Sequence, residues 1–442
     1  MPLPNGVLRV LERFEEHNIA AYAVGGCVRD YLRGVVPHDF DIATEAEPKD
    51  VCLLFADFHV VPTGLKHGTV TVISDGLPLE ITTFRVDGNY FDARHPENVR
   101  FTRSFREDCA RRDFTVNAMG YSMKEGIVDA YGGRRDLDAR VIRTVGEPNR
   151  RFREDALRIL RALRFSSVLG FDIEAETARA AREMAPSLRM VSVERIYEEL
   201  CKLLCGERAL EVLSDFRTVF AEILPEIVPC FDFEQKNPHH IYDVYRHTLH
   251  LFQHLPQDKT LRLAALLHDI GKPACFTRDE AGIGHFYSHA HISAELAEKV
   301  LLRFHADRET IQRVTLLVKH HGDALPTDKY GMRRLLAGRG EQFVFDLIAL
   351  KRADTLAQSP SCKDRLPALD EAEALCHALL LEKPCLSVRD LKVDGTDIMA
   401  HGVPRGREVG RILAALLDAV MKENLPNERD ALLDALKTLI DN

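Results

Sequence analysis

The sequence has no run that approaches about 18 apolar residues, the length at which a segment becomes a candidate membrane-spanning helix. Its start, MPLPNGVLRVLERFEEH, lacks the basic region and apolar centre of a signal peptide. We therefore expect neither a membrane span nor secretion, and we predict a cytoplasmic protein.

Paired cysteines and an overall positive charge are also lacking. None of the 10 cysteines forms a Cys-x-x-Cys pair, which disfavours a structural zinc site and indicates reduced thiols. The net charge of −9 argues against a protein that coats nucleic acid without specificity. Between Arg134 and Arg164, however, ten arginines stand against five acidic residues. This segment could attract a phosphate-rich partner.

The 442 residues are too many for a single core, and the 45% apolar and 29% charged residues are typical of globular domains. The stretch that organises the chain is residues 21–44. Ala20–Val24 predicts a buried strand ending in Gly25-Gly26, where a backbone can approach a ligand closely. A helix predicted from Cys27 to Arg33 would direct its first N–H groups and Arg29 at a phosphate over these glycines.

A second strand is predicted at Asp39–Ile42, with Asp39 and Asp41 on one face. Carboxylates this close repel unless a cation lies between them, and Mg²⁺ prefers carboxylates together with substrate phosphates. A solvated edge strand with incidental acids is the alternative. The segments TVTVI and LEITTF predict a hairpin around Ser74-Asp75-Gly76, with Glu80 in its second strand. Glu80 is either a third carboxylate of the same site or a solvent-facing residue.

The pattern GGCVRDYLRG…DFDIAT resembles the nucleotidyltransferase head of the DNA polymerase β superfamily. It is similar to the branch formed by class II tRNA nucleotidyltransferases and bacterial poly(A) polymerases. The resemblance implies that Asp39, Asp41 and Glu80 are catalytic carboxylates at a Mg²⁺ site. It also implies that Gly25, Gly26 and Arg29 form a triphosphate site.

Residues 86–110 show little periodicity, which predicts a mobile functional loop or a disordered insertion. In the resembled family a flexible loop here switches addition from C to A, so its presence disfavours the subgroup that adds only CC. The RRDFTVN segment follows, with Asp113 as a predicted helix N-cap. Arg112 and Asp113 could hold a ribose, or they could form a capping ion pair. Similarity to the family's ribose-sensing motif favours Arg112 as a nucleotide contact.

The segment 152–165, FREDALRILRALRF, predicts one continuous helix. Asp155 and Arg158 lie three residues apart on one face, which Arg161 and Arg164 continue. Cytosine and adenine each place an amine donor beside a ring-nitrogen acceptor, which fits an Asp that accepts and an Arg that donates; guanine and uracil do not fit. An ordinary surface ion pair is the alternative. The EDxxR spacing is similar to the motif by which the resembled family selects bases. Residues 172–225 predict helices without chemistry.

A second candidate site follows an apolar helix that ends in His268-Asp269 and continues with Gly-Lys. This pattern resembles the HD phosphohydrolases, in which His and carboxylate ligands hold a divalent ion that activates water. The resemblance implies further ligands at His247, His289, His320 or its neighbour His321, and Asp354. A purely structural His-Asp pair is the alternative. The ion would be Mg²⁺, Mn²⁺ or Ni²⁺.

The predicted fold class is an α+β nucleotidyltransferase head (1–140) with a small mixed sheet, an all-α neck and body (141–230), a helical HD domain (231–365) and a helical C-terminal segment (366–442). Leu391–Asn442 resembles the tRNA-contacting part of the family. The resemblance implies addition of C, C and A to tRNA from CTP and ATP. A poly(A) polymerase and an A-adding enzyme remain alternatives. The segment VVPTGLKHGTVTV lacks the GRRFR stretch expected of the polymerase, which disfavours the first of these. An HD phosphohydrolase with an RNA-binding head is the alternative of another class.

Overall fold

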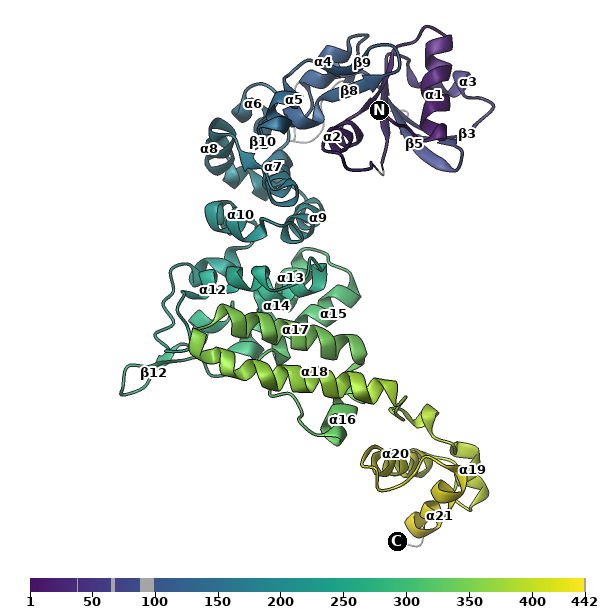
Figure 1. Cartoon of the computed structure of the whole chain (residues 1–442), viewed down its shortest axis with the longest axis vertical. Helices are drawn as coiled ribbons and strands as arrows, with labels where there is room; N and C mark the ends of the chain where they lie inside the picture. The colour runs from purple at the N-terminus through teal and green to yellow at the C-terminus, as the bar shows by residue number, and fades with distance from the viewer. Residues whose placement is uncertain (38, 65–67, 88–98, 441–442) are drawn as a thin grey trace. The chain divides into compact units, whose positions relative to one another are not determined.

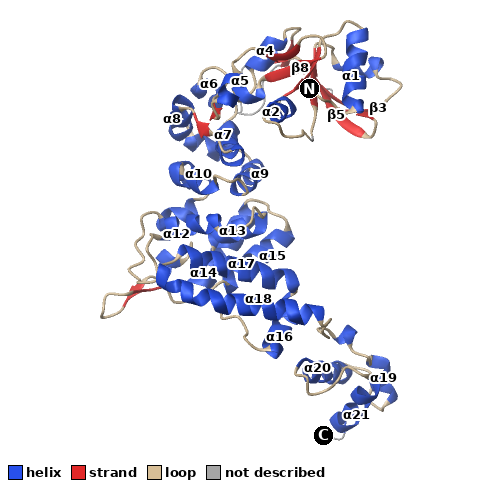
Figure 2. Cartoon of the chain, viewed as in Figure 1, coloured by secondary structure: helices blue, strands red, loops and turns tan. Residues whose placement is uncertain are grey.

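The computed structural model describes residues 1–37, 39–64, 68–87 and 99–440, and it contains two compact units, Met1–Pro225 and Glu226–Asn442 (Figure 1). Most strands belong to the first unit, whereas the second is almost entirely helical (Figure 2). The expected fold class is confirmed: a mixed sheet with helices precedes a helical remainder. No helix within the described ranges combines the length and the apolar character needed to cross a membrane.

The first unit is built on a seven-stranded mixed sheet. Its strands follow the order β3 (His59–Gly64), β4 (Thr69–Ser74), β5 (Leu77–Thr83), β2 (Asp41–Thr44), β1 (Ala21–Val24), β8 (Met119–Ser122) and β9 (Gly126–Asp129). Strands β2 and β5 run parallel, in a register that places Asp41 beside Glu80. The predicted hairpin is confirmed as β4 and β5, and its turn residues Asp75 and Gly76 both adopt positive φ.

Helix α1 (Asn5–Glu16) packs on this sheet because its apolar residues recur three or four positions apart. Val7, Val10, Leu11 and Phe14 are buried in the same core as residues of β2, β4 and β5. The ring of Phe14 meets that of Phe55, just after α3 (Pro48–Leu54), with centroids 5.2 Å apart.

The first unit contains the helix expected from Cys27 to Arg33, which is observed as α2. The helices of this unit are α1, α2 (Gly26–Leu32), α3 (Pro48–Leu54), α4 (Phe105–Ala110), α5 (Gly133–Asp138), α6 (Pro148–Glu154), α7 (Leu157–Leu169), α8 (Ala175–Glu183), α9 (Val193–Leu204), α10 (Ala209–Asp215) and α11 (Arg217–Ile223). The short strands β10 (Val141–Ile142) and β11 (Asp172–Ile173) pair in parallel beside them.

Two boundaries differ from the sequence prediction. The strand predicted at Asp39–Ile42 begins at Asp41, because pairing with β1 and β5 starts there; Asp39 is exposed just before it. The segment 86–110 is more regular than predicted, since β6 (Arg85–Asp87) pairs with β7 (Val99–Phe101) and α4 follows. Residues 88–98 lie outside the described residues, so the expectation of a flexible loop there stays a prediction.

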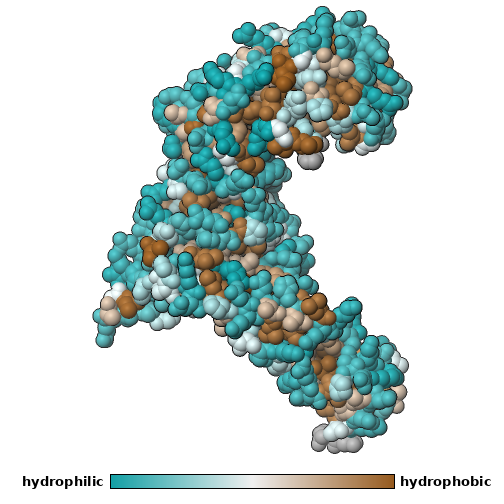
Figure 3. All heavy atoms as spheres, viewed as in Figure 1, coloured by the Kyte–Doolittle hydropathy of each residue, from teal (hydrophilic) through white to brown (hydrophobic). Residues whose placement is uncertain are grey.

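The second unit packs helices around its own cores. Its helices are α12 (Val244–His250), α13 (Lys259–Leu267), α14 (His289–Arg303), α15 (Arg308–His320), α16 (Lys329–Arg339), α17 (Glu341–Ala357), α18 (Leu366–Leu381), α19 (Gly395–Ala400), α20 (Arg407–Met421) and α21 (Arg429–Ile440), with a small hairpin of β12 (Thr277–Arg278) and β13 (Gly284–His285). Helix α13 is buried along its whole length, which fits its apolar sequence. On the face shown in Figure 3, hydrophilic residues surround separate hydrophobic groups.

Candidate functional site

A cavity of about 480 Å³ in the first unit gathers most of the residues predicted for nucleotide binding. Its lining comes from the end of β1, the segment after α4, and helices α7 and α9. Helices α7 and α9 pack against each other (Figure 1). The lining of the cavity comprises Gly25, Gly26, Arg29, Asp41, Arg111, Arg112, Asp113, Asn117, Asp155, Leu157, Arg158, Arg161, Arg164, Phe165 and Arg195. Seven of these are arginines, as expected of a site for a polyanion.

The glycine turn after β1 forms one wall. Gly25 adopts φ +76°, a conformation that L side chains rarely adopt. A Cβ atom added at Gly25 would lie 3.5 Å from Nη1 of Arg112, and one at Gly26 would lie 3.6 Å from Nη2 of Arg29. Both guanidinium groups therefore stand beside the open backbone. Asn117 holds Arg29 in place by accepting a hydrogen bond of 2.8 Å from Nη1.

Of the three predicted carboxylates, Asp41 lines this cavity, and the charges of Glu80 and Asp39 act on it. Asp41 is the Cα partner of Glu80 across the β2–β5 pair, and both side chains are accessible. The pKa of Asp41 is raised above its ordinary value, first by the surrounding protein atoms and then by the charges of Glu80 and Asp39. Ionised Asp41 is thus held at an energetic cost that a bound cation would remove.

Asp108, at the end of α4, positions two arginines of the cavity. It is fully buried and lies 2.8 Å from Arg111 and 3.1 Å from Arg112. Burial alone would raise the pKa of Asp108, but the two guanidinium groups lower it. The sequence prediction missed this residue, although an acid three and four positions before an Arg-Arg pair on a helix was the available signal.

The predicted N-cap role of Asp113 is wrong. Its Oδ1 accepts bonds from the next backbone N–H and from Asn117, while Oδ2 accepts two bonds from Arg161, at 2.6 and 2.9 Å. The short helix at 115–117 begins after Phe114 instead. Burial would raise the pKa of Asp113, but Arg161 and these hydrogen bonds lower it to about 2. Asp113 therefore orients Arg161 and Asn117.

The single helix predicted at 152–165 is also wrong. Helix α6 ends at Glu154 and α7 begins at Leu157, with the backbone of Asp155 extended (φ −148°, ψ 106°). The Oδ1 atom of Asp155 accepts a bond of 3.0 Å from the Leu157 N–H, so this side chain terminates the hydrogen-bonded ladder. Its Oδ2 atom lies 2.7 Å from Nη2 of Arg195.

Arg158 pairs with Glu154, at 2.7 Å, and not with Asp155 as an i,i+3 partner. It also donates to the backbone carbonyls of Arg151 and Arg111. The structure nevertheless brings Asp155 and Arg158 to the same cavity as Asp41. Their expected proximity to the glycine turn is therefore observed, although the partners that hold them differ from the predicted pair.

Helix α9 falls in the region for which no chemistry was predicted, yet it contributes side chains to this cavity and to the contacts behind it. Arg195 lines the cavity, and the buried Glu199 lies 2.6 Å from Arg164 and 3.4 Å from Arg161. Arg164 also stacks over Phe165, with Cζ 3.9 Å from the ring centroid. A sequence signal existed, because Glu199 occupies the apolar stripe of its helix, between Ile196 and Leu203.

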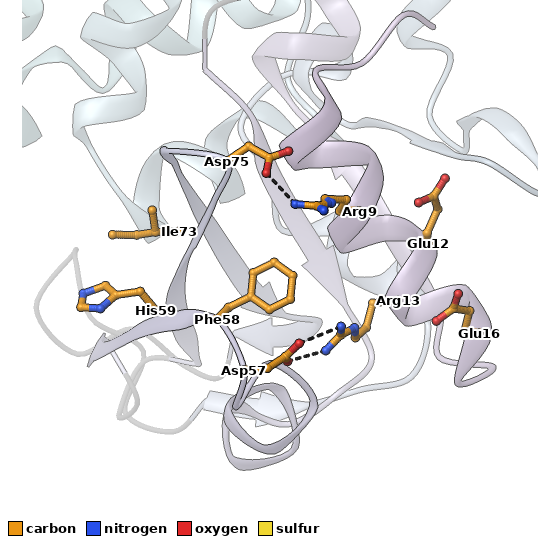
Figure 4. Close-up of a pocket in the computed structure, with 9 residues that line it drawn as sticks. All are labelled: Arg9, Glu12, Arg13, Glu16, Asp57, Phe58, His59, Ile73 and Asp75. Carbon is orange, nitrogen blue, oxygen red and sulfur yellow. Dashed lines mark hydrogen bonds and ion pairs between the residues drawn. The ribbon is translucent and has the colours of Figure 1, made fainter.

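A second pocket of the first unit carries no comparable chemistry. Figure 4 shows this pocket, of about 520 Å³, between α1 and residues 57–59, 73 and 75. Arg9 faces Asp75 at 2.6 Å, and Arg13 donates to Asp57 at 3.0 Å. Because its arginines are neutralised across the pocket, we assign no site there.

The second unit assembles five of the six predicted HD ligands. We use the name HD cluster for His247, His268, Asp269, His289, His321 and Asp354. His247 Nε2 lies 2.9 Å from Asp354 and 3.6 Å from Asp269, and His268 Nε2 lies 3.1 Å from Asp269. Lys272 Nζ lies 2.6 Å from Asp269. A cavity of about 380 Å³ opens onto the cluster.

Of the two adjacent histidines that the sequence left open, His321 lies in the cluster and His320 does not. His320 is the last residue of α15 and pairs with Asp323 at the surface, whereas His321 is buried with Nε2 3.2 Å from that of His289. Burial and the charge of His268 lower the pKa of His321 to about 4. Burial would raise the pKa of Asp269, but His268 and Lys272 hold it well below its ordinary value.

Three family models match the chain in the order of these sites. The poly(A) polymerase head domain matches residues 21–143, the RNA and SrmB binding site of polymerase A matches 170–230, and tRNA nucleotidyltransferase domain 2 matches 275–436. The last of these covers three of the six residues of the HD cluster, His289, His321 and Asp354, and its description does not mention an HD domain.

Curated relatives extend over the whole chain. The CCA-adding enzyme of Lactiplantibacillus plantarum is 31% identical over 442 residues, covering 98% of this chain and 96% of the relative. That of Leuconostoc citreum is 33% identical over 440 residues, with the same coverage. The CCA-adding enzyme of Geobacillus thermodenitrificans is 49% identical over 208 residues, 47% of this chain and 50% of the relative.

Among solved structures, the CCA-adding enzyme of Bacillus stearothermophilus in complex with CTP is similar with a TM-score of 0.72 and 28% identity. The similarity covers 100% of this chain and 98% of that one. The Thermotoga maritima CCA-adding enzyme complexed with tRNA shares the fold, with a TM-score of 0.59 and 22% identity, over 99% and 96% of the two chains. From the full-length relatives, the chain belongs to the family of CCA-adding enzymes.

Proposed function

We propose that the chain is a tRNA nucleotidyltransferase that adds CMP, CMP and AMP to the 3′ end of tRNA, using CTP, ATP and Mg²⁺. One observation carries the proposal: the carboxylate of Asp41, a glycine turn with two arginines, and an acceptor and donor able to read a base all line one cavity. The full-length similarity to CCA-adding enzymes supports it.

The carboxylates Asp39, Asp41 and Glu80 fit a divalent cation. Burial and then the charges of Glu80 and Asp39 raise the pKa of Asp41, and carboxylate oxygens beside a polyanion site suit Mg²⁺. When bound, the cation activates the tRNA 3′-hydroxyl and stabilises charge at the α-phosphate. The protein holds the carboxylates of Asp41 and Glu80 on two parallel strands, so that they do not have to be reorganised during the reaction.

Gly25, Gly26, Arg29 and Arg112 would hold the triphosphate and ribose. The absence of side chains at the glycines leaves space next to both guanidinium groups. Arg112 Nε is buried and has no hydrogen-bond partner among the described residues, so this donor is available to a ligand. Asp113 contributes by orienting Arg161, and Arg164 adds positive charge from α7.

Asp155 and Arg158 keep the donors and acceptors that base selection needs. A carboxylate has about four lone-pair positions, and the Leu157 N–H and Arg195 use two of those of Asp155. An arginine has five N–H donors, and three of those of Arg158 are occupied in the structure. The remaining acceptors and donors match the amine and ring nitrogen of cytosine or adenine. Guanine and uracil would leave unpaired groups, at about 1–3 kcal/mol each.

The test incubates the protein with tRNA that ends at the discriminator base, Mg²⁺ and each labelled nucleoside triphosphate. Incorporation limited to C and then A is expected. Long A tails on unrelated RNA would instead identify a poly(A) polymerase, and A added only to tRNA ending in CC would identify an A-adding enzyme. An absence of any transfer would leave the first unit as an RNA-binding head.

For the second unit, we propose that the HD cluster is a metal-dependent phosphohydrolase site. The buried Oδ1 atom of Asp269 has no hydrogen-bond partner among the described residues, and the Nε2 atoms of His247 and His268 face carboxylate oxygens, as expected of ligands to an ion. The test measures hydrolysis of 2′,3′-cyclic AMP and of nucleoside monophosphates with Mg²⁺, Mn²⁺ or Ni²⁺. Hydrolysis that His268→Ala abolishes, while tRNA addition persists, supports the proposal; no hydrolysis with any of the three ions contradicts it.

The structure divides into two compact units, and the finer division of the chain into four parts remains a proposal. We propose that Leu391–Asn442, which includes α19, α20 and α21, contacts tRNA. The segment has its own hydrophobic core, which includes Ile398, Ile412, Leu416 and Leu432 and is separate from the core of α16–α18. Such a separate core supports a binding role of its own.

A further inference from the structure

Phe165, in the second half of α7, lies in two environments. It belongs to a buried core that also contains Phe114, Leu137 and Ala162, and only 6% of its surface is exposed. It also lines the cavity of the proposed nucleotide site, where it is the single aromatic residue among the described residues of the lining. Packing in the core explains the first environment. It does not explain why a cavity lined mainly by charged side chains contains an aromatic ring.

Three guanidinium groups lie over this ring, and we use the name arginine cluster for Arg29, Arg161 and Arg164. The Cζ atom of Arg164 is 3.9 Å from the ring centroid, that of Arg29 is 5.3 Å away, and that of Arg161 is 5.4 Å away. All three distances are within the roughly 6 Å at which the face of an aromatic ring attracts a cation. Arg29 comes from α2 and the other two from α7, so the ring connects the helix after the glycine turn with the helix of Arg158.

Each member of the arginine cluster also has an acidic partner: Arg29 pairs with Asp30 at 2.9 Å, Arg161 with Asp113 at 2.6 Å, and Arg164 with Glu199 at 2.6 Å. Glu199 lies 3.4 Å from Arg161 as well, which connects the two arginines of α7. Among the described residues, no carboxylate lies within ion-pairing distance of both Arg29 and an arginine of α7. The ring of Phe165 is therefore a contact that all three arginines share and that the acids do not replace.

The positive charges of the arginine cluster repel one another. The pKa of Arg164 is lowered, first by burial and further by the charges of Arg161 and Arg29, although Glu199 opposes the shift. Like charges gathered on one ring are held at a cost that a bound anion would remove. All three arginines line the same cavity, so one chain of phosphates could contact them together.

We propose that Phe165 is a positioning residue, whose ring gathers the arginine cluster into one surface for the terminal phosphates of CTP or ATP. This inference rests on the proposed nucleotide transfer. In that reaction the α-phosphate lies at the carboxylate of Asp41, so the β- and γ-phosphates are the ones that extend toward other cations of the cavity. An aliphatic residue could fill the same core, but only an aromatic face attracts the cations. Because CTP and ATP have the same triphosphate, the ring acts on binding and not on the choice of base.

The experiment uses Phe165→Met, because methionine is apolar and adaptable but has no aromatic face. It measures CMP and AMP addition to tRNA by the full-length chain, and the inhibition of this addition by inorganic triphosphate, a probe without base or ribose, at fixed free Mg²⁺. The KM for CTP and for ATP should rise by about tenfold, and half-inhibition should need about tenfold more triphosphate, as for the loss of desolvated cation–π contacts. The kcat and the preference for C and A should stay the same. Phe165→Tyr, which restores a ring, should restore the values of the parent chain.

A second variant separates the aromatic face from core packing. Pentafluorophenylalanine incorporated at position 165 keeps the shape of the ring but removes the negative charge of its face. It should raise both KM values as Phe165→Met does, even if the methionine variant fails to fold. Phe14→Met is the matched control, because Phe14 is fully buried in the core of the sheet and does not line the cavity. It should keep the KM values of the parent chain, and thermal unfolding compares the stability of all variants.

The outcomes separate this inference from the proposed function. Parent values of KM and of triphosphate inhibition in the variant with the fluorinated ring would overturn the inference, and so would a failure of Phe165→Tyr to restore them. Phe165 would then be a core residue only, and the proposed nucleotide transfer would remain in place. A parent chain that adds no nucleotide would overturn the proposed function and this inference with it.

Discussion

Asp155 accepts a hydrogen bond from Arg195 at 2.7 Å, although 40 residues separate them in the chain. The contact exists because α6 and α7 are interrupted at Asp155, which turns this side chain out of the helical ladder and toward α9. Arg195 thereby fixes the carboxylate that we propose as the acceptor for the base. Base selection then depends on a residue that need not touch the base.

Asp155→Ala should weaken the preference for CTP and ATP over GTP and UTP by about tenfold to a hundredfold, since one matched polar contact is worth about 1–3 kcal/mol. Competition between labelled nucleotides in single-turnover addition measures the preference. Asp172→Ala is the control, because Asp172 is also ion-paired with an arginine of the first unit but lies at the surface. Unchanged selectivity in Asp155→Ala would contradict the proposed contact.

Arg195→Leu should lower selectivity in the same direction, because the carboxylate of Asp155 loses the partner that orients it. We expect a loss of about fivefold to tenfold, corresponding to about 1 kcal/mol for one hydrogen bond. In the double variant with Arg195→Leu and Asp155→Ala, the two losses of selectivity should not add, since both changes act through one acceptor. Arg189→Leu, which breaks an exposed pair with Glu222, should leave selectivity unchanged. Additive losses would show that Arg195 acts independently of Asp155.

Asp41→Asn should reduce nucleotide addition by about a hundredfold or more, because a metal-ion site supplies several kcal/mol of transition-state stabilisation. The same change should raise the free energy of unfolding of the metal-free protein. The pKa of Asp41 is higher when folded, so its ionised form is disfavoured in the folded state at neutral pH. Urea unfolding with and without Mg²⁺ measures both effects. Loss of stability in the metal-free variant would argue against a site of repelling carboxylates.

The buried ion pair of Asp113 with Arg161 should make the stability of the fold depend on pH in the acid range. The pKa of Asp113 is lowered from 3.8 to about 2, so its contribution to stability is present above pH 3.8 and is lost as the pH falls toward 2. The total is on the order of 2 kcal/mol for this shift. Asp113→Asn should remove that part of the acid dependence, as measured by urea unfolding between neutral pH and about pH 3. An identical pH profile in the variant would contradict the role of the Arg161 pair.

Local patterns predicted the scaffold of the first site well. The strand, the glycine turn and the β4–β5 hairpin depend on alternation and on turn residues that neighbours in sequence determine, so the proximity of Asp41 and Glu80 could be expected. The break at Asp155 could not, because the apolar spacing of 152–165 is the same for one helix and for two. The pairing of Arg195 with Asp155 depends on how α9 packs against α7, which no local pattern specifies.

The second site shows the same limit at the level of one residue. His320 and His321 are adjacent, and only the direction in which α15 ends decides which of them is buried. The sequence pattern left both open. The order of the remaining ligands along the chain was enough to predict the cluster, because each falls on a helix or turn that packs around the same apolar α13.

Asp108→Asn should weaken nucleotide binding without changing the selectivity between bases. The change leaves Arg111 and Arg112 without their buried counter-charge, which should lower the free energy of unfolding by about 3 kcal/mol. Because Arg112 would lose its position beside the glycine turn, the KM for CTP and for ATP should rise together, by about tenfold or more for a charged hydrogen bond. Selectivity between bases should persist, since Asp155 and Arg158 keep their own partners. Steady-state kinetics with each nucleotide measures this, and a rise for only one nucleotide would show that Asp108 acts through the base-reading residues instead.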